Sequence, residues 1–81
     1  MTEMINNIGN RMVSKARLVN RVLKDWYNGE MNSNLRSNPF YSEFQGMRQM
    51  LTAMHIEYSV DYDDNVEQMT AITILGTRFE I

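Results

Sequence analysis

The feature that most constrains the fold is a long apolar period near the start of the chain. Between residues 4 and 28, apolar side chains recur every three or four positions, at Ile5, Ile8, Met12, Ala16, Val19, Leu23 and Trp26. At about 100° per residue this spacing places them on one side of an α-helix. We therefore predict a helix over about residues 4–28. Gly29 ends it, because glycine readily takes the left-handed conformation that closes many helices.

The opposite side of the predicted helix is basic. Arg17, Arg21 and Lys24 lie one turn apart there, with Asn10, Asn20 and Asn28 beside them. Residues 1–28 hold five basic and two acidic residues, whereas residues 29–81 hold three basic and eight acidic ones. The sequence therefore predicts a molecule with a basic helix and an acidic C-terminal part.

Length and composition indicate one small domain covering residues 1–81. A chain of 81 residues is near the size at which one hydrophobic core is only just sufficient. There is no cysteine, so neither disulfides nor thiolate metal sites can contribute to its stability. No apolar run reaches the roughly 18 residues of a membrane span, and the first residues do not resemble a secretory signal. We expect a cytoplasmic protein without a membrane partner.

A second helix is predicted over about residues 39–55, after a loop over residues 29–38. Asn38 is suited to cap it and Pro39 to occupy its first turn, although Ser42 and Gln45 form a competing capping box. Its apolar positions are again three or four apart, at Phe40, Phe44, Met47, Leu51 and Met54. Gly46 costs the helix about 1 kcal/mol relative to alanine, which suggests close approach of another backbone there.

After His55 the apolar period changes to two, which is typical of strands with one buried face. We predict strands over about residues 56–62, 66–75 and 78–81. Turns lie at residues 63–65 and at Gly76 and Thr77, and the alternative at Gly76 is one long strand bent at a bulge. The second strand is apolar on both faces, so it is the central one. The predicted fold class is α+β: two helices followed by an antiparallel hairpin or three-stranded meander, with the helices packed on one sheet face.

Neither catalysis nor metal binding is expected from the motifs. The chain has one histidine, His55, and no cysteine or glycine-rich phosphate loop. His55 lies where a helix ends, so a positive side chain there suits the helix dipole. The acidic run 61–67 superficially resembles a calcium loop. However, Val66 and Ile72 stand where an EF-hand needs glycine and a bidentate glutamate. We therefore expect no enzyme activity, metal or cofactor.

Two groups of residues are candidates for contacting a protein partner. The first is an acidic hairpin suited to a basic site, comprising Glu57, Asp61, Asp63, Asp64 and Glu67. Its alternative interpretation is the solvated side of a strand. The second group is apolar and comprises Trp26, Tyr27, Met31 and Met50. The leading interpretation is a small protein-binding module acting by steric or electrostatic blockade. In style it resembles accessory proteins of bacteriophages and other mobile elements, including inhibitors of host defence.

Two further interpretations stay open. The basic side chains Arg17, Arg21 and Lys24 are of the kind that contact phosphates, so the alternative is a nucleic-acid-binding accessory protein. The other is a self-associating structural module, in which an uncovered surface pairs with its own copy as a homo-oligomer.

Overall fold

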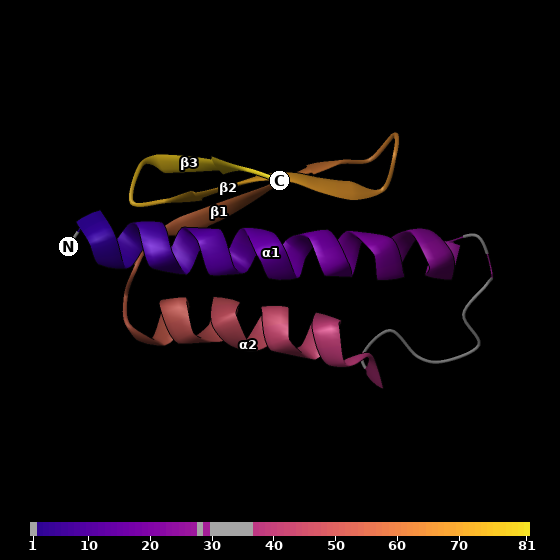
Figure 1. Cartoon of the computed structure of the whole chain (residues 1–81), viewed down its shortest axis with the longest axis horizontal. Helices are drawn as coiled ribbons and strands as arrows, with labels where there is room; N and C mark the ends of the chain where they lie inside the picture. Colours follow the sequence, from indigo (N-terminus) through magenta and orange to yellow (C-terminus); the bar gives the residue numbers. More distant parts are fainter. Residues whose placement is uncertain (1, 28, 30–36) are drawn as a thin grey trace.

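The computed structural model describes residues 2–27, 29 and 37–81, and its elements follow the predicted order (Figure 1). They are α1 (Thr2–Tyr27), α2 (Pro39–Ala53), β1 (Tyr58–Asp63), β2 (Gln68–Ile74) and β3 (Thr77–Glu80). The strands form one antiparallel sheet in the order β1-β2-β3, so the prediction of a central second strand is confirmed. Both helices lie on one side of this sheet. α1 packs on β2 and β3, and α2 packs mainly on α1 (Figure 1).

α1 buries a wider face than its apolar period predicts. Met12, Ala16 and Val19 are buried as expected, and Val13 and Val22 are buried beside them. The reason is that α1 contacts α2 on one side and the sheet on another, so two adjoining stripes leave the solvent. Trp26, at the end of the predicted stripe, is instead 44% exposed.

α2 begins as predicted and ends slightly earlier. The Asn38 side chain accepts hydrogen bonds from the backbone N–H groups of Phe40 (3.0 Å) and Tyr41 (3.3 Å), which confirms it as the N-cap. At the other end His55 has a φ of 58°, and the backbone N–H of Ile56 donates to Leu51 O at 2.9 Å. This left-handed closure is a Schellman motif. His55 therefore helps to end α2 through its left-handed backbone conformation. The sequence had instead suggested a role for its positive charge at the end of the helix dipole.

The turns of the sheet differ from the predicted ones. The connection between β1 and β2 takes four residues, 64–67, so β2 begins at Gln68 rather than at residue 66. Between β2 and β3 the turn residues are Leu75 and Gly76, not Gly76 and Thr77, because Ile74 pairs with Thr77. Both turn residues have positive φ, 48° and 83°, as a type I′ turn requires. A leucine in this conformation is strained.

A buried amide joins α1 to the sheet. Asn20 is only 8% exposed, and its side chain donates to Met69 O (3.0 Å) and accepts from Met69 N (2.9 Å). Its carboxamide thus binds a strand backbone as a neighbouring strand does. The prediction that Asn20 lies beside the basic side chains of α1 is wrong, because Asn20 belongs to the helix–sheet interface.

Among the glycines described, Gly9 of α1 has the closest neighbour from another element. A β-carbon there would lie 2.3 Å from the ring of Phe79 on β3. Gly46, by contrast, has nothing within 4 Å of the place where its β-carbon would stand. The suggestion that Gly46 marks a close backbone approach is therefore wrong. The glycine with a close neighbour is Gly9, and that neighbour is the side chain of Phe79 rather than a backbone.

Substitution by alanine should change the free energy of unfolding in opposite directions at Gly46 and Gly9. Gly46→Ala should raise the free energy of unfolding by about 1 kcal/mol, because alanine favours the helix and meets no neighbour. Gly9→Ala should lower it by roughly 1–3 kcal/mol, because the added methyl group collides with Phe79. Urea denaturation followed by circular dichroism measures both variants, and a stabilising Gly9→Ala would contradict the close packing.

Asn20→Asp should destabilise the fold by roughly 2–3 kcal/mol at neutral pH, because a buried carboxylate faces Met69 O and cannot donate to it. Burial raises the pKa of the new carboxyl above its unfolded value. The loss should therefore shrink as pH falls through that pKa, since the neutral acid regains a donor. Denaturation at neutral and acidic pH tests this, with Asn10→Asp on the exposed side of α1 as the matched control. Equal effects of the two variants would rule out the amide link.

Candidate partner-binding surface

An apolar cleft lies between α1, α2 and β1. It has a volume of about 340 Å³. Its residues come from all three elements and from β2: Val19, Leu23, Tyr41, Phe44, Gln45, Arg48, Val60, Tyr62 and Met69. Most of these side chains are apolar or aromatic, and they stand on helices and strands. A concave, largely apolar site on rigid elements is the usual setting for binding a ligand or an anchoring side chain of a partner.

The cleft exists because the helices cover β1 less fully than β2. On β2, Ile72 and Ile74 are fully buried, whereas their partners Val60 and Tyr58 on β1 are only half-buried. α1 packs under β2 and β3, and α2 lies chiefly against α1. The helix-facing side of β1 is therefore only partly covered.

A chain of polar contacts along α2 borders the cleft. Gln45 Nε2 donates to the Tyr41 hydroxyl at 2.9 Å, and Arg48 Nη1 donates to Gln45 Oε1 at 3.3 Å. Arg48 Nε also donates to the hydroxyl of Tyr58 at 3.2 Å, which links α2 to β1. These contacts fix the orientation of the side chains around the cleft. The apolar and polar pattern of the sequence did not predict these contacts, because the contact of Arg48 with Tyr58 depends on the distance between α2 and β1.

The predicted acidic residues do not form one free row. Asp63 accepts a hydrogen bond from the backbone N–H of Asn65 (2.9 Å), and Glu67 accepts one from the Tyr62 hydroxyl (2.7 Å). Glu57 and Asp64 are exposed. The group still gives this part of the molecule a negative charge, but Asp63 and Glu67 also stabilise the local turn through these hydrogen bonds.

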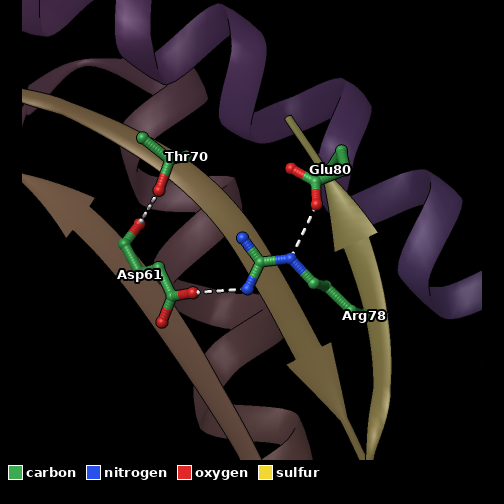
Figure 2. Close-up of polar contacts among 4 residues, drawn as sticks. All are labelled: Asp61, Thr70, Arg78 and Glu80. Carbon is green, nitrogen blue, oxygen red and sulfur yellow. Dashed lines mark hydrogen bonds and ion pairs between the residues drawn. The ribbon is translucent and has the colours of Figure 1, made fainter.

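Asp61 lies on the face of the sheet away from the helices, in an ion-pair cluster (Figure 2). Arg78 Nη1 contacts Asp61 Oδ2 at 2.9 Å and Arg78 Nε contacts Glu80 Oε1 at 2.6 Å, while the Thr70 hydroxyl donates to the Asp61 carbonyl at 3.4 Å. The hydrogen bonds to Glu80 and then to Asp61 raise the pKa of Arg78 above its ordinary value. The Arg78 side chain reaches from β3 across β2, where Ala71 is fully buried.

The basic candidates lie together on α1. Arg17, Arg21 and Lys24 are all exposed, and within the described residues no ion pair involves them. Lys15, on the same helix, is different because it forms an ion pair with Glu43 of α2. The structure therefore brings together the three basic residues that the sequence singled out.

The apolar candidates are separated. Trp26 is 44% exposed at the last turn of α1, and Met50 is 49% exposed near the end of α2. The helices run in opposite directions, so these two residues lie towards opposite ends of the helix pair (Figure 1). The side chain of Tyr27 and the whole of Met31 lie outside the described residues.

No protein-family model matches the chain, and the searches of curated proteins and solved structures found no significant match. Within the described residues, no three acidic or histidine side chains are grouped closely enough to hold a metal ion. Over the same part of the chain, neither helix combines the length and the apolar character needed to cross a bilayer.

Proposed function

We propose that this protein is a non-catalytic protein-binding module whose partner places an apolar side chain in the cleft between α1, α2 and β1. The cleft carries the proposal, because it combines apolar and aromatic side chains that stand on helices and strands. Of its lining residues, Phe44 is buried, whereas Tyr41 and Tyr62 remain partly accessible. Aromatic pockets of this kind receive the few side chains that supply most of the energy of a protein interface.

The charge along β1 favours a basic partner. Within the described residues, four carboxylates on β1 and its flanking residues form no ion pair: Glu57, Asp63, Asp64 and Glu67. Asp61 is instead paired with Arg78 on the face of the sheet away from the cleft, and Arg48 is the cation among the residues that line the cleft. Such a field attracts a basic surface and repels acidic competitors. In this proposal the protein acts by occupying a functional surface of its target, as an accessory protein or inhibitor from a phage or another mobile element would in the cytoplasm.

The proposal predicts that a charge introduced at Tyr62, in the cleft, weakens binding. A photoreactive amino acid in place of Tyr62 first identifies the partner by crosslinking in host lysate. Tyr62→Lys should then weaken the affinity of the protein for this partner by roughly 30-fold or more. Leu75→Lys is the matched control, since Leu75 is a comparably exposed apolar residue at the far turn of the sheet. Calorimetric titration of the purified pair measures both. Equal affinities of Tyr62→Lys and the unmodified protein would exclude the cleft.

One observation favours nucleic-acid binding as a second candidate function. Arg17, Arg21 and Lys24 form an exposed row on α1, and within the described residues no carboxylate is paired with them. Positive side chains one helical turn apart can contact successive phosphates.

Reversing these three charges separates the two functions. If α1 binds nucleic acid, Arg17→Glu, Arg21→Glu and Lys24→Glu together should abolish the affinity, which in the unmodified protein should fall steeply with salt. Glu57→Gln with Asp64→Asn is the opposite control, because it should weaken only binding to a basic protein. Fluorescence anisotropy with labelled DNA and RNA provides the measurement. No detectable affinity in the unmodified protein at low salt would exclude this candidate.

A further inference from the structure

β1 has an open edge whose backbone groups can be assigned. It pairs with β2 on one side, and no described residue pairs with it on the other. Leu75 N donates to Glu57 O at 3.0 Å, so the backbone of Glu57 faces β2. Because this direction alternates along an antiparallel strand, Ser59 also faces β2, whereas the N–H and C=O groups of Tyr58 and Val60 point outward. These four groups are available to another strand.

The side chains at the same two positions face the helices. Val60 lines the cleft, and Tyr58 lines a neighbouring shallow hollow of about 460 Å³ whose other residues belong to α2. A strand paired with Tyr58 and Val60 would point every second side chain towards α2, because paired residues share a face of the sheet. One such side chain would enter the cleft. The edge and the cleft therefore form one continuous binding surface.

The other edge of the sheet lacks this combination. β3 has only four residues and carries Arg78 and Glu80, which are charged side chains of the kind that discourage strand addition. α1 also packs directly beneath it, with Gly9 against the ring of Phe79. Along β3, Ile81 N donates to Thr70 O at 3.0 Å, so the backbones of Arg78 and Glu80 point outward. These two residues provide an internal comparison for Tyr58 and Val60.

We infer that β1 receives an extended, basic segment of a partner protein as a fourth strand, with one apolar side chain of that segment in the cleft. The inference rests on the proposed function and adds the extended conformation of the partner segment and its pairing with the edge of β1. Backbone pairing supplies affinity in such complexes and alternate side chains supply specificity. The irregularity between Asp61 and Tyr62 limits the regular edge to its first residues, so pairing is short and the cleft contact is needed as well.

Peptides of about ten residues displayed on phage provide the test, since this length exceeds the regular edge. Selected peptides should alternate apolar residues with lysine or arginine. An N-methyl group should weaken binding by roughly tenfold or more where the peptide N–H faces β1, and little at the positions between. In the unmodified protein, the peptide should slow hydrogen exchange at the amides of Tyr58 and Val60, and leave those of Arg78 and Glu80 unchanged.

A backbone substitution provides a second test. Val60→Pro removes an outward N–H that does not pair with β2, so it should reduce peptide affinity by roughly tenfold or more while the fold remains. Glu80→Pro makes the same change at the outward position of β3 and should leave affinity unchanged. Circular dichroism verifies the fold of both variants. The N-methylated peptides are tested on the unmodified protein, so that result does not depend on whether either variant folds.

The outcomes separate this inference from the function on which it rests. Alternating N-methyl effects with slowed exchange at Tyr58 and Val60 support strand addition. Peptides that lose affinity with Tyr62→Lys but show no alternation would overturn strand addition and leave cleft binding intact. Failure to select any peptide sensitive to Tyr62→Lys or Val60→Pro would overturn both. Selection of acidic segments would overturn the basic partner.

Discussion

The packing of α1 against both α2 and the sheet is the contact on which the remaining structure depends. α1 runs between these two parts of the molecule (Figure 1). Met12, Ala16 and Val19 form its buried centre, while Asn20 bonds the backbone of β2 and Gly9 accommodates Phe79 of β3. Without α1, the sheet would expose Ile72 and Ile74 to water and would lose the helix packing that stabilises a sheet of so few strands.

The same arrangement explains why one strand remains accessible. A single long helix can cover the adjacent strands β2 and β3, and α2 is held against α1 by contacts that include the ion pair of Lys15 with Glu43. β1, at the edge of the sheet beside β2, keeps half-buried side chains and an outward backbone edge. The face of the sheet away from the helices is closed differently, by the charged side chains around Arg78 (Figure 2). The partly accessible apolar side chains of β1 therefore lie on the helix side of the sheet.

Local patterns predicted the elements and their order, because each depends on neighbours within a few residues. The apolar period of α1, the capping by Asn38 and the alternation along β1 are of this kind. The positions that the sequence misassigned depend on distant partners. Asn20 is polar, so only the Met69 backbone, 49 positions later, explains its burial. Gly9 could not be separated from Gly46 without knowing where Phe79 lies.

The candidate site was less predictable than the fold for the same reason. The basic row of Arg17, Arg21 and Lys24 follows from helical spacing alone, and the structure places those residues together. The cleft requires the separation between α2 and β1, which no local pattern encodes. The role of Asp61 likewise depends on Arg78, which lies 17 positions away and meets it through strand register.

The turn between β2 and β3 bears on the order in which the chain folds. Leu75 holds a left-handed conformation that costs an ordinary residue roughly 1–2 kcal/mol, so this hairpin gains little from its own turn. Its stabilising contacts, such as that of Phe79 with Gly9, come from a helix some 70 positions earlier. We expect the hairpin to form together with the docking of α1 rather than before it. Folding of this small protein would then be governed by long-range loop closure more than by local nucleation.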